Sequence, residues 1–402
     1  MTELTVRVAA ADEYDELLRC FADAMMIEWP ASETGRAVFE PERALAVNDG
    51  DEVVATAKAL TRDLSVPGAV VPAAHVTGVG VRATHRRKGV LSRLMTRQLQ
   101  DVPEAFAVLW ASEPAIYGRF GYAPAAWGTT YEVELPRIKP KRVEDPGRLR
   151  EIPVEGSGGV LAPLLAEYQQ FRPGVSSRTA PWWENRLSDP SEGRQGRSAL
   201  KLVVHENASG AIDGYALSRN KLNWNAGGPA GEVSIEELVA LDFTAYGGLW
   251  QHFLTMDLAT VLRFNHGAID EPVQQLVANP EALNRRIGET LWIRVTDVAR
   301  ALAQRRYATS VDVVLEVTDD LLPANAGRYR LTADEDKVRC ERTEDPADLA
   351  LSITELGAVY LGGRTLTEFA RTGRVREVRP GTLTPATAAF TWPVAPGSIE
   401  IF

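Results

Sequence analysis

The 402-residue chain has few cysteines, few histidines and no long apolar run. Its two cysteines, Cys20 and Cys340, are too few for a disulfide framework, and its five histidines show no spacing typical of a metal site. No stretch approaches the roughly 20 apolar residues that a membrane-spanning helix requires. The N-terminus also lacks the basic and then apolar segments of a secretory leader. We therefore expect a cytoplasmic protein with no metal site and no membrane association.

Positive charge is also scarce, because 44 Lys and Arg stand against 54 Asp and Glu, a net charge of -10. This balance argues against a nucleic-acid-binding surface and is compatible with cationic small-molecule partners. Despite the negative net charge, three basic residues lie side by side directly before Gly89: Arg86, Arg87 and Lys88. Three adjacent cations repel one another, so this cluster is expected to bind an anion.

The length exceeds that at which a single hydrophobic core usually keeps growing, so two or three domains are expected. In the first block, apolar spacing predicts helices over 12–25 and 91–102. Strands are predicted over 44–47, 53–60, 75–81 and 106–111, with a Pro-Gly turn within 65–71. The stretch 135–159 is rich in Pro, Gly and charge and is interpreted as a linker.

The second block repeats the order of the first without its cations, which indicates a degenerate internal repeat. Strands are predicted over 201–205, 214–218 and 235–241, and a helix over 249–262. A third block begins near 291 and has predicted strands over 311–317, 328–331 and 348–353, then a helical segment around 355–363. Strands followed by helices are typical of a compact α+β unit.

The basic turn lies between a predicted strand and a predicted helix, where backbone N–H groups and the helix dipole favour a phosphate. It is neither a P-loop nor a G-x-G-x-x-G turn. The residues from Arg86 to Leu91 instead have the spacing of the R/Q-x-x-G-x-G/A motif of acyl-CoA-binding proteins, with leucine at the last small position. A solvated basic start of a helix is the alternative interpretation.

Two neighbouring segments support a ligand site. The strand VTGVGV (76–81) has glycines in its interior, which mark a bulge or a close backbone approach to a ligand. A bend without a ligand is the alternative. In SEPAIYGRFGYAPA (112–125), Tyr117 is a candidate general acid, because a phenol stays protonated at neutral pH and can protonate a leaving thiolate. A packing tyrosine is the alternative.

The segments 71–91, 111–125 and 356–363, together with an acidic and aromatic C-terminal tail, resemble the Eis (enhanced intracellular survival) family of GNAT acetyltransferases over essentially the whole chain. The resemblance implies an α+β protein with tandem GNAT-like mixed α/β domains: an active one over 1–145 and a degenerate one over 146–291. A sterol carrier protein-like α+β domain follows over 292–402. The resemblance also implies a homohexamer.

The resemblance further implies acetyl-CoA as co-substrate and a broad range of amine acceptors. These acceptors include aminoglycosides modified at several positions, with polyamines and protein lysines also possible. The residues expected to bind acetyl-CoA are Val79, Gly80, Val81, Arg86, Arg87, Lys88, Gly89, Val90, Leu91, Ser92, Ser112 and Glu113.

Tyr117 and the C-terminal carboxylate of Phe402 are the expected catalytic acid and base. An unperturbed α-carboxyl group has a pKa of about 3.3 to 3.7, so burial or Glu400 would have to raise the pKa of this base. A tail with a structural role only is the alternative. The residues expected to meet the amine are Asp23, Glu28, Trp29 and Glu400, although a solvated helix end explains the first three equally well.

Two rival functions remain open. One is a narrower acetyltransferase that acts on a protein lysine or a polyamine. The other, from a different class, is an apolar-ligand or lipid-binding protein whose acetyltransferase half is vestigial.

Overall fold

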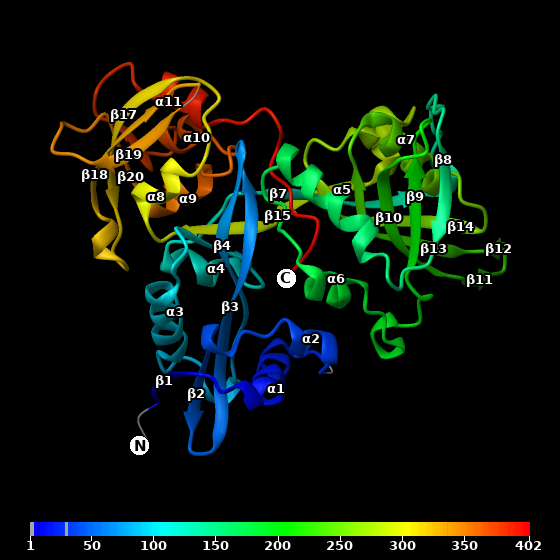
Figure 1. Ribbon diagram of the computed structural model, residues 1–402, viewed down its shortest axis with the longest axis horizontal. Helices are drawn as coiled ribbons and strands as arrows, with labels where there is room; N and C mark the ends of the chain where they lie inside the picture. The colour runs from blue at the N-terminus through cyan, green and yellow to red at the C-terminus, as the bar shows by residue number, and fades with distance from the viewer. Residues whose placement is uncertain (1–3, 29–30, 336) are drawn as a thin grey trace. The chain divides into compact units, whose positions relative to one another are not determined.

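The computed structural model describes residues 4–28, 31–335 and 337–402 (Figure 1). Its contacts divide the chain into two compact units. The first holds the residues up to Ala126, Thr290–Pro393 and Phe402; the second holds Trp127–Glu289 and Val394–Ile401. The predicted boundary at 145 falls inside the second unit, and the first and third predicted domains share one unit. The division at 145 and 291 stays a prediction.

The first unit is built on a seven-stranded sheet in the order β1-β2-β3-β4-β5-β16-β6. Its strands are β1 (Val6–Val8), β2 (Ala44–Asp49), β3 (Glu52–Val66), β4 (Ala69–Val81), β5 (Phe106–Trp110), β6 (Ala123–Pro124) and β16 (Leu291–Val295). Strands β3 and β4 form one long hairpin that turns at Pro67 and Gly68. The Pro-Gly turn predicted within 65–71 is thereby confirmed.

Alternating apolar residues on this hairpin and on β2 bury both faces of the sheet. Leu17 and Cys20 of α1 (Tyr14–Met25) pack with Ala44 and Ala46 on one face. On the other face, Val90 and Leu94 of α3 (Val90–Asp101) join the core with the alternate residues Leu45, Val47, Ala55 and Ala57. The two helices therefore cover opposite faces.

The remainder of the first unit is a five-stranded sheet in the order β19-β18-β17-β20-β21. Its strands are β17 (Val311–Thr318), β18 (Gly327–Ala333), β19 (Val338–Arg342), β20 (Leu349–Ser352) and β21 (Val375–Glu377). The other helices of the unit are α2 (Glu33–Ala37), α4 (Pro114–Tyr117), α8 (Val298–Ala303), α9 (Ile353–Val359), α10 (Leu366–Ala370) and α11 (Leu383–Phe390). One hydrophobic core joins Phe106, Ile293, Leu315 and Leu356, so the two sheets stabilise each other.

The second unit repeats the first sheet in the order β15-β7-β14-β13-β10-β9-β8. Its strands are β7 (Trp127–Glu134), β8 (Arg148–Ile152), β9 (Lys201–Glu206), β10 (Ile212–Lys221), β13 (Gly231–Ala240), β14 (Ala259–Ala268) and β15 (Arg285–Glu289), with a small hairpin of β11 (Trp224–Asn225) and β12 (Gly228–Pro229). Its helices are α5 (Gly158–Phe171), α6 (Ala180–Leu187) and α7 (Phe243–Leu254). Strands β13 and β14 are parallel, as are β4 and β5, which supports the predicted internal repeat.

Two sequence predictions in this unit were wrong. The helix predicted over 249–262 begins earlier, because the Asp242 carboxylate accepts a hydrogen bond from the Ala245 N–H and caps α7, and β-branched residues from Thr260 onward belong to β14. The linker predicted over 135–159 contains β8, whose Arg148 and Arg150 both pair with Glu206.

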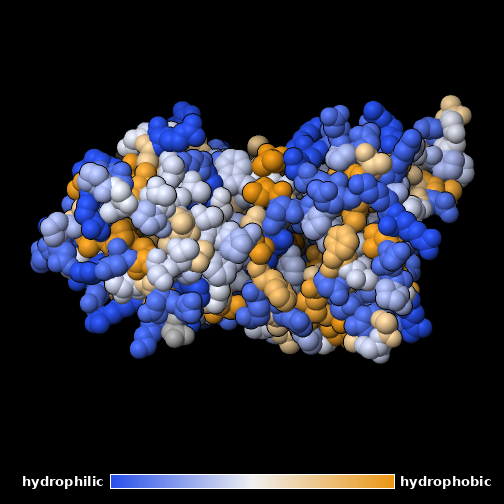
Figure 2. All heavy atoms as spheres, turned by 90° about the horizontal axis from the view of Figure 1, so that it is seen from above, coloured by the Kyte–Doolittle hydropathy of each residue, from blue (hydrophilic) through white to orange (hydrophobic). Residues whose placement is uncertain are grey.

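On the face drawn in Figure 2, hydrophilic residues cover most of the surface and hydrophobic ones form smaller groups between them. In the part of the chain that the structure describes, no helix is long and apolar enough to cross a membrane.

Candidate active site

The candidate site begins where two parallel strands of the first unit separate. β4 and β5 pair only at Ala74 with Ala107 and at His75 with Val108. Beyond His75, the segment 76–81 continues without β5 beside it, while its other edge stays paired with β3. A strand with one free edge can offer backbone hydrogen bonds to an extended ligand. The predicted residues Val79, Gly80 and Val81 lie on this segment.

The glycines of this strand accommodate protein neighbours. The register between β3 and β4 shifts between Thr56 and Lys58, so a bulge lies opposite Ala57, and Gly78 there has a φ of 62°. A Cβ on Gly78 would lie 3.1 Å from Cε of Lys58, and a Cβ on Gly80 would lie 2.9 Å from Cβ of Ala24 in α1. The bulge predicted from the glycines is confirmed, and their close approach is to Lys58 and α1.

The basic turn opens directly onto the N-terminus of α3. Gly89 adopts the left-handed conformation there (φ 76°), and Arg87, an L-residue, also has a positive φ of 61°. Among the described residues, no side chain caps α3 and no acidic residue lies in its first turn. Arg87, Lys88 and Ser92 are exposed, whereas Val90 is buried and Leu91 partly buried in the core. Free N–H groups and exposed cations together suit a phosphate.

Arg86 contributes to this turn in another way. Its Nε donates to the Val81 carbonyl at 3.2 Å and its Nη2 donates to the Ala24 carbonyl at 2.8 Å. The guanidinium therefore ties the turn to the end of β4 and to α1. Sequence reasoning assigned Arg86 to the cofactor, whereas these two contacts hold the loop in place.

Tyr117 is the last residue of α4 and is 7% exposed. Its ring meets the Tyr122 ring edge to face at 6.1 Å. Burial raises the pKa of the Tyr117 phenol, whereas a hydrogen bond with Ser112 lowers it and the nearby Glu113 raises it. The group is thus held protonated, and Ser112 stabilises the phenolate that would form after it donates a proton. Ser112 and Glu113 are themselves exposed.

The C-terminal residue reaches β4 within the same unit. The Thr77 hydroxyl donates to a carboxyl oxygen of Phe402 at 2.9 Å, and the Phe402 ring meets the His75 ring at 4.6 Å. The ring anchor predicted for the tail is thus visible. His75 and Thr77 were not among the predicted site residues. Their alternate positions on one strand place them on the same face, which is the signal that could have found them.

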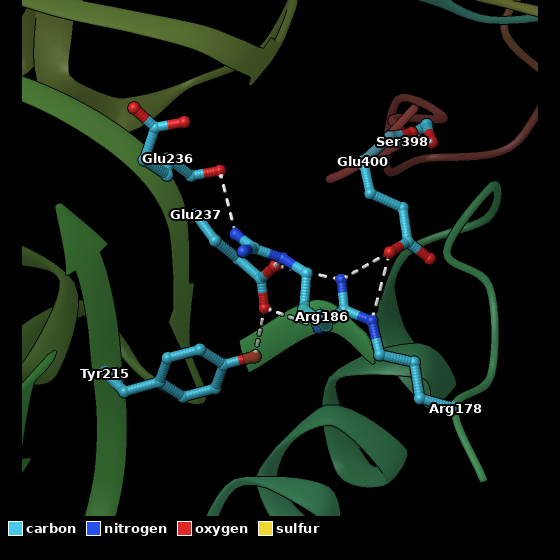
Figure 3. A network of polar contacts seen from close by, with 7 residues as sticks. All are labelled: Arg178, Arg186, Tyr215, Glu236, Glu237, Ser398 and Glu400. Carbon is cyan, nitrogen blue, oxygen red and sulfur yellow. Dashed lines mark hydrogen bonds and ion pairs between the residues drawn. The ribbon is translucent and has the colours of Figure 1, made fainter. Parts of the chain in front are cut away.

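The tail before Phe402 is fixed within the second unit (Figure 3). The Glu400 carboxylate accepts hydrogen bonds from Nε and Nη2 of Arg178 at 3.0 and 2.7 Å. Arg178 in turn pairs with Glu237, which also accepts from Arg186 and from the Tyr215 hydroxyl. Burial alone would raise the pKa of Glu237, but the two arginines hold it below its usual range.

This network changes the interpretation of Glu400. The sequence predicted that its carboxylate meets the amine substrate. In the structure that carboxylate is only 12% exposed and neutralises a buried arginine. We therefore assign Glu400 to anchoring of the tail.

The remaining residues predicted for the amine are exposed or outside the described residues. Asp23 lies on α1, and its carboxylate is 3.7 Å from the Arg82 guanidinium. Glu28 follows the end of α1 and is exposed. Trp29 lies outside the described residues. The structure thus brings Asp23 near the strand that ends at Val81, and leaves the solvated-helix interpretation of Glu28 open.

In the second unit, too, two parallel strands separate, but the residues around that place differ from those in the first unit. A cavity of about 280 Å³ lies where β13 and β14 separate, lined by Leu238, Asp242, Tyr246, Phe264 and Glu271 among others. Asp242 places a carboxylate on the N-terminus of α7. The corresponding N-terminus of α3 in the first unit has no side-chain cap. The Asp242 carboxylate competes with a phosphate for the same N–H groups, so α7 is less suited to bind an anion than α3 is.

Family models match three parts of the chain. Two stretches match models described as acetyltransferase (GNAT) domains, over residues 5–125 and 174–300. A third, over residues 298–397, matches a model described as a sterol carrier protein domain.

Similar proteins cover nearly the whole chain. A Streptomyces avermitilis protein described as an uncharacterized N-acetyltransferase is 41% identical over 97% of this chain and 98% of its own. The crystal structure of Eis1 from Mycobacterium abscessus has a TM-score of 0.84 at 33% identity, and the match covers 99% of this chain and 100% of that one. The chain belongs to the Eis family of N-acetyltransferases. The Mycobacterium tuberculosis N-acetyltransferase Eis is 29% identical over 90% of both chains.

As a member of the Eis family, the protein is an N-acetyltransferase with two GNAT domains and a sterol carrier protein-like domain. The predicted tandem architecture and family are thereby confirmed. In the described residues, no group of three or more His, Cys, Asp or Glu is arranged to hold a metal ion. The absence of a metal from this Eis-family enzyme stays a prediction.

Replacing Arg87 and Lys88 together with alanine should raise the KM for acetyl-CoA roughly tenfold or more, because charge-assisted hydrogen bonds to phosphate are lost. Folding should be unchanged, since both side chains are exposed. Steady-state kinetics measures the effect. The control is Lys139→Ala with Lys141→Ala, which removes two exposed charges elsewhere. An equal change in KM in both variants would assign the turn to the solvated basic helix start.

Proposed function

We propose that the protein transfers the acetyl group of acetyl-CoA to primary amines of many kinds, including aminoglycosides at more than one position. The observation that carries this proposal is the Phe402 carboxylate, held by Thr77 on the free-edged segment of β4. A carboxylate at that place can accept a proton from an amine next to the strand that would hold the thioester.

The described residues fit acetyl-CoA. The free edge of 76–81 supports a role in pairing with the amides of the pantetheine arm. The exposed Arg87 and Lys88, with the uncapped N-terminus of α3, would hold the pyrophosphate. When bound, acetyl-CoA supplies an activated acyl group. The protein's part is to orient that group and to move protons.

The proton transfers balance as follows. An ammonium acceptor gives one proton to the Phe402 carboxylate and becomes a nucleophilic amine. The nitrogen forms a bond to the carbonyl carbon while the carbon–sulfur bond breaks. Tyr117 gives its proton to the departing thiolate. The second proton, which the nitrogen loses as the amide forms, then reprotonates Tyr117. The Phe402 carboxyl then releases the first proton to water. Amide, thiol and one solvent proton are the products, and acid and base return to their starting states.

A broad range of amine acceptors is expected from the residues predicted to meet the amine. Asp23, whose carboxylate lies 3.7 Å from the Arg82 guanidinium, and Glu28 are exposed carboxylates, which attract cations without fixing one orientation. An aminoglycoside carries several ammonium groups, so different amines of one molecule can reach the same base. We extend the proposal to polyamines and protein lysines as further acceptors.

Thiol release from acetyl-CoA against a panel of aminoglycosides, spermidine and lysine peptides tests this proposal. Broad acceptance, with more than one acetyl group per aminoglycoside by mass spectrometry, is the expected result. Turnover confined to a lysine peptide or to spermidine would replace it with the narrower acetyltransferase. No thiol release with any amine would contradict it altogether.

Lipid binding is less well supported. A surface depression of about 570 Å³ in the sterol carrier protein-like part is lined mainly by polar residues, among them Glu316, Ser352, Glu355, Arg374 and Arg376. Such a lining suits a polar ligand better than an acyl chain. The homohexamer rests on the family resemblance, and light scattering at several concentrations tests it.

A further inference from the structure

A single lysine interrupts the apolar interior of β3. Lys58 lies between Ala57 and Ala59, both buried, and is itself partly buried. It pairs directly with Thr77 across the two antiparallel strands. Directly opposed residues in such a pair point to the same face of the sheet, with Cβ atoms about 5 Å apart. Lys58 therefore shares a face with the threonine that holds the Phe402 carboxylate.

The Lys58 side chain packs against Gly78 at the bulge of β4. A Cβ built on Gly78 would lie 3.3, 3.5 and 3.1 Å from Cγ, Cδ and Cε of Lys58. The lysine carbons thus occupy the space that any side chain at position 78 would need. Nζ is one bond beyond Cε, so the amine lies close to the bulge at Gly78. The bulge is within the segment that continues without β5 beside it, directly before the proposed acetyl-CoA residues 79–81.

The amine of Lys58 is suited to react. Among the residues that the structure describes, none forms a hydrogen bond or an ion pair with Nζ. Burial lowers the pKa of Lys58, because the charged form is poorly solvated there. A lowered pKa leaves more of the neutral amine at neutral pH than an exposed lysine has, and only the neutral amine attacks a thioester.

We propose that Lys58 is an internal acetyl acceptor, which the protein modifies with acetyl-CoA when no external amine occupies the site. This inference rests on the proposed function, because it uses the same acetyl donor. Nζ forms a bond to the acetyl carbon as the carbon–sulfur bond breaks, and the proton lost by nitrogen ends on the CoA thiol. The amide formed is unreactive, so the modification is an end state and is limited to one acetyl group per chain.

The test uses the full-length protein with acetyl-CoA and no added amine. We expect a burst of thiol that approaches one per chain and then stops. Trypsin should then yield the peptide 44–62 uncleaved at Lys58 and carrying one acetyl group, because acetyl-lysine is not cut. The burst rate should rise with pH and level off at a lower pH than the acetylation of an exposed lysine does.

Two variants and one internal reference make the test specific. Lys58→Arg keeps the positive charge and should lose the burst. Lys221→Arg removes an exposed lysine at the end of β10 and should keep it. In the wild-type protein, acetylation of Lys58 should be about tenfold or more faster than that of Lys221, since positioning next to the thioester accelerates the step.

Thiol release with an aminoglycoside or polyamine is measured on the same samples. Normal release with no acetyl group on Lys58 would overturn the self-acetylation and leave the proposed function standing. Acetylation of Lys58 no faster than that of Lys221, or a burst that persists in Lys58→Arg, would also overturn it. A protein that releases no thiol with any amine would overturn both proposals.

Discussion

A short Gly-Ser extension after Phe402 is expected to lower kcat about a hundredfold, the usual contribution of a positioned base. The extension leaves every side chain in place and replaces the Phe402 carboxylate by a neutral amide. The oxygen that accepts from Thr77 could remain bonded, but it would no longer carry the charge needed to take a proton from an ammonium group. Steady-state kinetics should show an almost unchanged KM for acetyl-CoA, which contacts other residues.

Deletion of Phe402 is expected to be at least as severe, since it also removes the ring that packs against His75. Ile401→Ala is the matched control, because Ile401 is 65% exposed and its side chain contributes little to the tail's anchoring. That variant should keep wild-type kcat. Full activity of the extended protein would reduce the tail to a structural element and assign the base to another group.

Tyr117→Phe is expected to lower kcat at least about tenfold while the KM for acetyl-CoA changes little. The substitution keeps the buried ring and its contact with Tyr122, and removes only the proton that the leaving thiolate needs. Because burial raises the pKa of this phenol, it stays protonated above pH 7. Its ionisation should therefore produce no loss of rate in the wild-type enzyme between pH 7 and about pH 10.

Tyr122→Phe is the control for this substitution. Tyr122 is fully buried beside Tyr117, and its hydroxyl has no hydrogen-bond partner among the described residues. Loss of this hydroxyl should leave kcat close to wild type. If Tyr117→Phe were as active as Tyr122→Phe, then Tyr117 would be a packing residue and a solvent molecule would protonate the thiolate.

Local patterns predicted most elements of the fold. The helix predicted over 12–25 is observed as α1, and 91–102 as α3, because apolar residues at helical spacing need only a neighbouring sheet to bury them. The helix predicted over 249–262 was misplaced. Its apolar residues suit either a helix or a strand, and the Asp242 cap together with pairing to β13 decided between them.

Local patterns did not predict which strands pair when they are distant in the sequence. β16 follows the whole second block and yet lies between β5 and β6 of the first sheet. β8 lies in a stretch whose composition is typical of a linker, and its pairing with β9 makes it a strand. In each case the partner is distant in sequence, so no local period reveals it.

The sequence by itself determined the family. It also predicted an anion-binding turn and the candidate acid Tyr117, because each of these depends on residues that are close together along the chain. Only the tertiary structure decided how the tail is used. Thr77 and Phe402 are 325 positions apart, and Arg178 and Glu400 are 222 apart. It also decided that Lys58 occupies the space beside Gly78, since that contact follows from the register of β3 against β4 and its bulge. Registers and distant contacts are set by the packing of whole elements, and a single short segment carries no record of them.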